Sequence, residues 1–217
     1  MKRLLAAAAL VSFAIGSSSA NGAIVPEEYG AGREIPMIEI VDDAGRVRSL
    51  ETFKGAPMIL APIFTSCPLA CPTIANNLIA AAAESEEGLS TYRVLFLSFD
   101  PDDDVAALKR FRERQGVPLP WTIARAEPQD VRRLLDAVGY SYRKVDGQFT
   151  HPNMVIAFTP ELTTAKYMMG TSYDLDEALR LARGSRDWVH GYGAITLSML
   201  LLLCISSLVY LVVLIIR

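Results

Sequence analysis

Residues 58–72 read Met58-Ile-Leu-Ala-Pro-Ile-Phe-Thr-Ser-Cys-Pro-Leu-Ala-Cys-Pro72, an apolar run followed by two cysteines. The run Met58–Phe64 is short and rich in strand-forming residues, and a polar pair ends it. Pro68 and Pro72 suit the approach to a helix and its first turn, where a missing N–H has no cost. The stretch therefore predicts a buried strand that leads into a helix over Pro72–Glu86, with Cys67 and Cys71 at the junction.

Apolar runs and helical patterns alternate along the rest of the chain. The other expected strands are Tyr92–Phe99, Asn153–Thr159 and Thr163–Met169, preceded by a hairpin of Ile38–Val41 and Arg46–Ser49. The other expected helices are Asp103–Gln115, Pro128–Val138 and Asp174–Arg183. Near-continuous apolar strands indicate a sheet that is covered on both faces. The order of elements predicts an α/β sandwich of thioredoxin type with an N-terminal β-hairpin.

The two ends of the chain predict export and membrane attachment. Residues 1–20 have a basic start, a short apolar run and small closing residues, the pattern of a cleaved signal peptide, with an uncleaved anchor as the alternative. Residues 193–216 carry no charge and are mostly Leu, Ile and Val, and ~20 such residues are enough to cross a bilayer. We therefore expect a periplasmic domain over 21–187, held in the cell inner membrane by a single C-terminal transmembrane helix in the lipid bilayer.

The charge distribution argues against a nucleic-acid partner. The chain has a formal net charge of −3. All 24 acidic residues lie between Glu27 and Asp187, together with 18 of the 21 basic residues, so this middle part carries −6. A nucleic-acid-binding protein needs a concentrated basic face instead.

The two cysteines of the opening stretch are the first candidates for chemistry. A thiolate at a helix N-terminus is stabilised by the free N–H groups and the helix dipole, which lowers its pKa. Cys67 and Cys71 are therefore predicted to form a redox pair or, as two convergent sulfurs, to hold a soft metal such as Cu(I). A structural disulfide is the alternative, although so short a loop would constrain the unfolded chain little. The third cysteine, Cys204, lies in the predicted transmembrane segment.

His151 is the candidate for a third ligand. It directly precedes a core strand, in a loop that a thioredoxin-like sheet places beside the first helix, so it could meet both cysteines. Three ligands satisfy Cu(I), whereas structural zinc normally takes four. The alternative is a loop histidine that only caps or packs. His190, close to Trp188 and Tyr192, is interpreted as an interfacial residue.

The acidic run Asp100–Asp104 has two interpretations. Its carboxylates could bind Ca²⁺ or Mg²⁺, but such a run more often caps the following helix, and Asp100 could border the cysteine site. No serine–histidine–acid order, glycine-rich phosphate loop or HExxH motif occurs in the sequence, so hydrolase and kinase functions have no support.

Three motifs in this order resemble the Sco/SenC family: Phe64–Pro72, Leu97-Ser-Phe-Asp-Pro101 and Thr150-His151. The similarity runs over about residues 35–184. It implies a thioredoxin-like fold that binds copper through Cys67, Cys71 and His151. It also implies a role in building the dinuclear copper centre of cytochrome c oxidase, on its subunit II. The C-terminal anchor departs from the N-terminal helix of many members, which leaves another membrane-bound copper protein, or a redox partner, open as client.

Two functions follow, and they make different use of the site. A copper metallochaperone would hold one ion with all three side chains and pass it on by ligand exchange. A thiol-disulfide oxidoreductase would need only the cysteines, with Cys67 attacking and Cys71 resolving, and has no need of His151. A peroxiredoxin-like peroxidase fits less well, because it expects a wider Pro, Thr and Cys spacing than this chain has.

Overall fold

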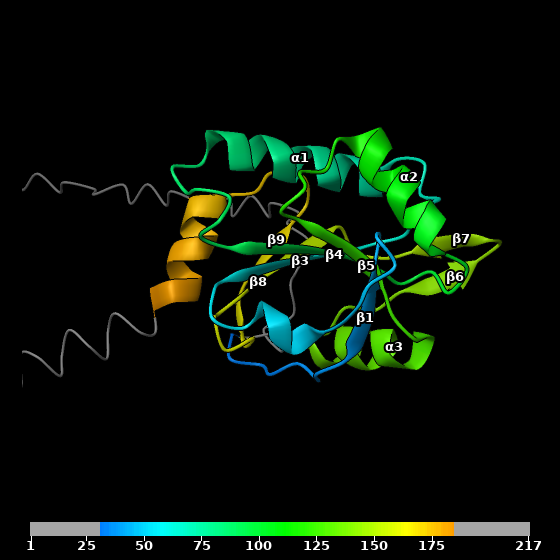
Figure 1. Cartoon of the computed structure of the whole chain (residues 1–217), viewed down its shortest axis with the longest axis horizontal. Coiled ribbons are helices and arrows are strands. Elements are labelled where there is room, and N and C mark those ends of the chain that lie inside the picture. The colour runs from blue at the N-terminus through cyan, green and yellow to red at the C-terminus, as the bar shows by residue number, and fades with distance from the viewer. Residues whose placement is uncertain (1–30, 185–217) are drawn as a thin grey trace, which may run out of the picture.

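A computed structural model describes residues 31–184 and contains a seven-stranded mixed sheet with the order β2-β1-β5-β4-β3-β8-β9 (Figure 1). A separate two-stranded hairpin, β6–β7, projects beyond the sheet. The strands are β1 (Glu39–Asp42), β2 (Val47–Ser49), β3 (Met58–Ile63), β4 (Arg93–Ser98), β5 (Thr122–Arg125), β6 (Arg143–Val145), β7 (Gln148–Thr150), β8 (Met154–Phe158) and β9 (Thr164–Met169). The helices are the short 3-10 turn η1 (Leu50–Phe53), α1 (Ala70–Glu84), α2 (Val105–Gln115), α3 (Pro128–Ala137) and a last helix that begins at residue 175.

The centre of the sheet consists of apolar strands that are buried on both faces. All six residues of β3 are buried, as are all five of β8. β3 pairs with β4 in parallel from Met58 and Arg93 to Ile63 and Ser98, so the carboxyl ends of both strands meet at one edge. β8 pairs antiparallel to β3 on its other side. The two cysteines of the predicted site follow β3 at this edge.

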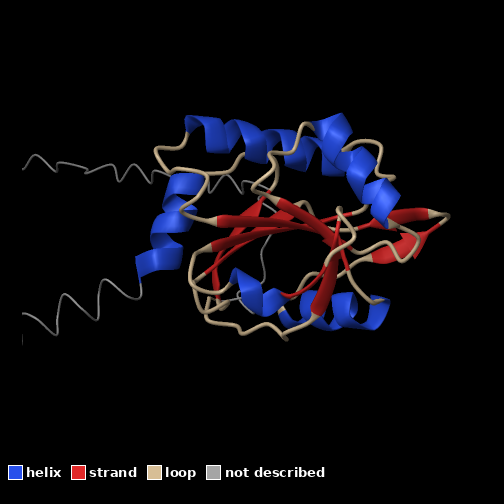
Figure 2. Cartoon of the chain, viewed as in Figure 1, coloured by secondary structure: helices blue, strands red, loops and turns tan. Residues whose placement is uncertain are grey.

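Helices cover the sheet in two layers. Figure 2 shows α1 and α2 along one face of the sheet and α3 against the other. The buried residues of α1 include Cys71, Ile74, Ala75 and Leu78, the spacing by which an amphipathic helix packs one side on a core. The mixed sheet between helical layers matches the predicted α/β sandwich. Figure 2 also shows the last helix at the end of the sheet away from the β6–β7 hairpin.

Most expected elements are present, and the differences have physical reasons. The helix after the cysteine stretch starts at Ala70 rather than Pro72, because a proline is tolerated anywhere in the first turn, where its N–H is not needed. β5 was not predicted, since four residues with polar ends give no apolar run. The β6–β7 hairpin was also missed, although Asp146-Gly147, both with positive φ, form the two-residue turn that favours hairpins.

Neither terminal prediction falls on the part of the chain that the structure covers. The expected signal peptide (1–20) and transmembrane helix (193–216) lie outside the described residues. Within residues 31–184 no helix has the length and apolar character of a membrane span.

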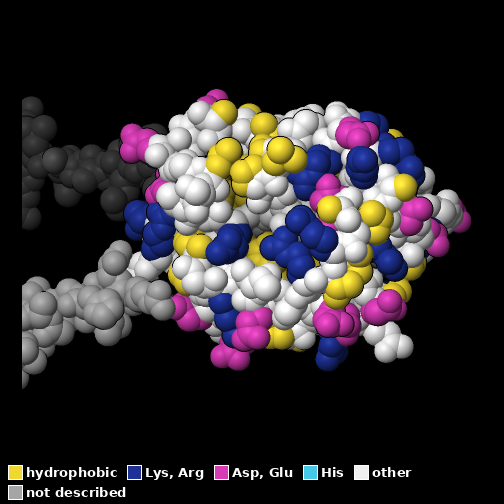
Figure 3. Space-filling model, in the orientation of Figure 1, with side chains coloured by type: hydrophobic (Ala, Val, Ile, Leu, Met, Phe, Trp, Pro, Cys, Tyr) yellow, Lys and Arg dark blue, Asp and Glu magenta, His cyan; other side chains and the backbone are white. Residues whose placement is uncertain are grey.

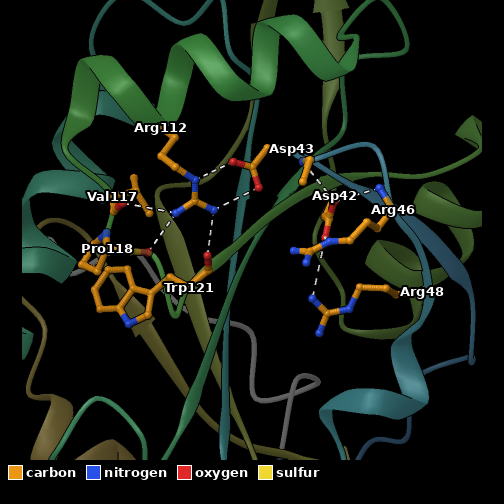
Figure 4. A network of polar contacts seen from close by, with 9 residues as sticks. Asp42, Asp43, Arg46, Arg48, Arg112, Val117, Pro118 and Trp121 are labelled. Atoms are coloured by element: carbon orange, nitrogen blue, oxygen red, sulfur yellow. Dashed lines mark hydrogen bonds and ion pairs between the residues drawn. The ribbon is translucent and has the colours of Figure 1, made fainter.

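The largely buried Arg112 connects α2 with the end of β1 and the segment before β5 (Figure 4). Arg112 of α2 forms two hydrogen bonds with the Asp43 carboxylate, of 2.5 and 3.0 Å, and donates to the carbonyls of Val117, Pro118 and Trp121. The two charged side chains are only 15% and 14% exposed. Such a bidentate pair fixes α2 against the end of β1 and the start of β5.

We expect Arg112→Ala to lower the free energy of unfolding by about 2–4 kcal/mol, because it leaves the Asp43 carboxylate and several carbonyls without their partner. Urea titration of the purified protein measures this loss. Arg110→Ala, at an exposed position of the same helix, is the matched control and should change stability by less than about 0.5 kcal/mol. Equal losses in the two variants would contradict the assigned role of Arg112.

Candidate metal and thiol site

The two cysteines lie where β3 ends and α1 begins, but at different depths. Cys67 precedes the helix and is 9% exposed, whereas Cys71 lies in its first turn and is fully buried. The N-cap residue Leu69 offers no side-chain cap; the Cys71 N–H instead donates to the Cys67 sulfur over 3.3 Å. The N–H of Phe64 donates to the Cys71 sulfur over 3.4 Å. Neither cysteine forms a disulfide, and each sulfur accepts a backbone N–H.

These contacts give the two thiols opposite acidities. The Cys71 thiol hydrogen bonds to the Cys67 sulfur and lowers the pKa of Cys67 to about 5, against the opposing effect of burial and with help from backbone N–H groups of residues 69–71. The pKa of Cys71 is raised, because its proton is held by Cys67 and because burial disfavours a second thiolate. At neutral pH the site therefore contains one thiolate, on Cys67, and one thiol.

His151 joins the two cysteines from a distant part of the chain, the segment between β7 and β8. It follows β7 directly, and one ligand atom from each of Cys67, Cys71 and His151 lies within 4.8 Å of the other two. The imidazole lies among aromatic rings, with centroids 5.4 Å from Phe99 and 5.7 Å from Phe64. The structure thus brings together all three residues that the sequence singled out.

Tyr140 fixes the orientation of this imidazole, a role that no feature of the sequence indicated. The Tyr140 side chain is 1% exposed, and its hydroxyl lies 3.0 Å from Nδ1 of His151. Burial raises the pKa of Tyr140, so the hydroxyl stays protonated. Nδ1 also lies 3.1 Å from the Pro152 carbonyl oxygen. These contacts engage Nδ1, whereas Nε2 has no hydrogen-bond partner among residues 31–184.

A buried carboxylate holds the loop that leads to Cys67. Asp103 is 6% exposed and accepts hydrogen bonds from the Thr65 N–H (2.9 Å), the Thr65 hydroxyl and the Ser98 hydroxyl. The guanidinium of Arg114 donates to the Thr65 carbonyl over 3.1 Å. Asp103 thereby connects the ends of β3 and β4. Its signal in the sequence was the acidic run, whose individual members could not be assigned from sequence alone.

The other members of the acidic run have local roles. Asp104 is the N-cap of α2, and its side chain accepts the N–H of Ala107 over 2.7 Å, so the helix-cap interpretation is confirmed for this residue. Asp100 accepts the N–H of Asp102 over 3.1 Å, and burial raises the pKa of its carboxyl. The cluster of described residues with metal-ligand geometry is the cysteine–histidine group, which contains none of these carboxylates.

Comparison with known proteins identifies the family. The sequence pattern of SCO1/SenC matches residues 28–182, more than half of the chain. The chain belongs to the SCO1/SenC family. Among characterised SCO1/SenC relatives, the mitochondrial SCO2 homolog of Bos taurus is 37% identical over 75 residues, which are 33% of this chain and 28% of the bovine protein. The human mitochondrial SCO2 homolog is 33% identical over 75 residues, with the same shares.

Solved structures of similar proteins share the fold. A candidate electron transfer protein from Aquifex aeolicus VF5 is 34% identical with a TM-score of 0.68, and the match covers 71% of this chain and 95% of the Aquifex chain. The copper-bound ScoI of Arabidopsis thaliana is 21% identical with a TM-score of 0.58, and the match covers 67% and 92%. At that identity the Arabidopsis structure supports the fold of this SCO1/SenC chain. Its copper is a property of that protein.

The acidity of Cys67 is open to direct measurement. In a Cys204→Ser background, the ultraviolet thiolate absorbance of the reduced protein should be constant around neutral pH and disappear as the pH falls through about 5. Cys67→Ser should abolish this transition. Cys71→Ala should move it to higher pH, since the thiolate loses its largest stabilising hydrogen bond. A transition near the ordinary thiol value in the parent protein would contradict the assigned contacts.

Proposed function

We propose that this protein is a membrane-anchored copper metallochaperone that holds Cu(I) with Cys67, Cys71 and His151. The observation that carries the proposal is the convergence of two sulfurs and one imidazole nitrogen within 4.8 Å at a buried sheet edge. Thiolates select Cu(I) among the common ions, and three ligands are sufficient for it. Family membership supports the same conclusion, because its copper-bound members include ScoI of Bradyrhizobium japonicum and yeast Sco1.

The dimensions of the cluster suit a single ion as cargo. Metal–sulfur and metal–nitrogen bonds of about 2.0–2.3 Å place three ligand atoms about 3.5–4 Å apart, so the side chains need to close only slightly. Cys67 supplies a thiolate already formed at neutral pH. Cys71 must release its proton to the solvent as its sulfur binds, and His151 binds as the neutral imidazole through Nε2, because Tyr140 and Pro152 engage Nδ1.

The proposed client is the dinuclear copper centre of cytochrome c oxidase, on subunit II. BsSco is a member of the Sco family of cytochrome c oxidase assembly proteins, and this chain belongs to the SCO1/SenC family. The predicted segments 1–20 and 193–216 would place the domain on the periplasmic side of the inner membrane, facing an exported copper site. Ligand exchange with two cysteines of the client would transfer the ion without any change in its charge.

Anaerobic loading of the reduced full-length protein with Cu(I) tests the proposal. We expect one ion per chain in the parent protein and its loss in both His151→Ala and Cys67→Ser. The chain offers matched controls in its other histidine and third cysteine, so His190→Ala and Cys204→Ser should still bind one ion. Copper binding that persists in His151→Ala, or no binding in the parent protein, would overturn the metallochaperone assignment.

The split acidity of the cysteines supports a second candidate, a thiol-disulfide oxidoreductase. The Cys67 thiolate would attack a client disulfide, release one client thiolate and form a mixed disulfide. Cys71, after losing its proton, would then attack the Cys67 sulfur, which releases the second client thiolate and leaves Cys67 and Cys71 oxidised as a disulfide. Oxidised subunit II or another exported copper protein would be reduced in this way.

His151 separates the two functions. If reduction is the activity, we expect His151→Ala to reduce a client disulfide at a rate within about twofold of the parent protein, while Cys67→Ser loses the activity entirely. Stopped-flow measurement of thiol release from an oxidised CxxxC peptide provides the rates. A large loss of reduction in His151→Ala would show that the imidazole is part of the thiol chemistry and would contradict this assignment.

A further inference from the structure

Two hollows lie on either side of Tyr142 and Arg143, beside the β6–β7 hairpin. The first has a volume of about 420 Å³ and is lined by Ser141, Thr150, Pro152 and the candidate ligand His151, together with the two shared residues. The second has a volume of about 240 Å³ and continues from the shared residues toward Pro101, Pro128 and Phe149. The two hollows are adjacent, because they share two lining residues, and the surface that they make together, with His151 at one end, is here called the hairpin groove.

The charge of the hairpin groove is the opposite of the charge of the domain. Its charged lining residues are Arg132, Arg143 and Lys144, and no acidic residue lines either hollow. Residues 31–184 as a whole carry 21 acidic and 17 basic side chains, a net charge of −4. On the face drawn in Figure 3, dark blue basic and magenta acidic side chains are interspersed. The groove is therefore a local basic surface on an acidic domain.

Two of the three basic side chains of the groove lie against aromatic rings. The Arg132 guanidinium lies 4.9 Å from the centre of the Tyr142 ring, and the Lys144 ammonium lies 5.1 Å from the centre of Phe149. Lys144 also pairs with the exposed Asp102 over 3.2 Å. Rings and prolines supply flat apolar contacts between the cations, which suits an extended chain that alternates acidic with apolar or proline residues.

We propose that the hairpin groove docks an acidic, extended segment of the protein that exchanges copper with this chain. The inference rests on the proposed metallochaperone function and names the chemistry of its partner. A segment bound along the groove would place the partner's own ligands beside His151, at the open side of the copper site. A lipid surface fits less well, because the cations line concave hollows that a flat bilayer does not enter.

Electrostatic docking of this kind has two measurable properties. Complementary charges speed the encounter of the two proteins, and this gain decreases as salt screens the charges. Reversal of groove charges should weaken binding without affecting copper, because Arg132 and Arg143 are absent from the cysteine–histidine cluster. Docking and ion binding can therefore fail independently, and an experiment can tell the two failures apart.

The test uses the full-length protein in detergent and a labelled peptide of alternating glutamate and proline, with the glutamine–proline peptide for comparison. We expect the glutamate peptide to bind about tenfold or more tightly than the glutamine peptide, with an affinity that falls as salt is added. The double variant Arg132→Glu/Arg143→Glu should lose this preference. Fluorescence anisotropy gives the affinities, and Cu(I) stoichiometry is measured on the same samples.

The matched control makes the same change of charge elsewhere. Arg93 and Arg180 are exposed, at the amino end of β4 and on the last helix, so Arg93→Glu/Arg180→Glu should bind the glutamate peptide within about twofold of the parent protein.

Equal binding of both peptides, or equal losses in the two double variants, would overturn the proposal. Binding of short-chain phosphatidylserine that depends on Arg132 and Arg143, with no peptide preference, would assign the groove to lipid and also overturn it. Absent copper binding with intact peptide preference would overturn the metallochaperone function while leaving the groove's specificity for acidic chains established.

Discussion

The parallel pairing of β3 with β4 is the constraint on which the rest of the structure depends. It brings the carboxyl ends of two strands, 35 residues apart at Ile63 and Ser98, to one edge of the sheet. Asp103 then connects the loops that leave these strands by accepting hydrogen bonds from Thr65 and Ser98. The loop so fixed leads directly into Cys67 and α1. The position of the thiolate is thus set by strand register and one buried carboxylate before any metal or client is present.

The sequence predicted the fold class and the three clustered residues because their determinants are local. Each pattern can be recognised from a few adjacent residues: the short apolar run, the cysteine pair with its prolines and the histidine before a strand. The resemblance to Sco/SenC then implied that the two cysteines and the histidine form one copper site. The same local reasoning missed β5, whose four residues become a strand only because β4 and β1 provide edges for it on both sides.

The surroundings of the site could not be predicted for a related reason. Tyr140 contacts His151 from a segment eleven residues earlier in the chain, and nothing in its own neighbourhood indicates that a tyrosine hydroxyl will meet an imidazole. Asp103 belongs to a run of acidic residues in which Asp104 caps a helix while Asp103 turns inward. Whether a given carboxylate caps the helix or binds Thr65 depends on the distance from the end of β4 to the start of α2, which is a property of the assembled fold.

The different depths of the two sulfurs impose an order on any exchange at this site. Cys71 is fully buried, and its sulfur accepts the Phe64 N–H. Cys67 has a small exposed surface, and His151 borders a hollow that is open to solvent. An incoming group therefore meets the imidazole and the Cys67 thiolate first, and Cys71 is the last contact to be reached and the last to be given up. Access from one side makes exchange here a stepwise process, in which the innermost sulfur keeps its hold while the outer positions change partners.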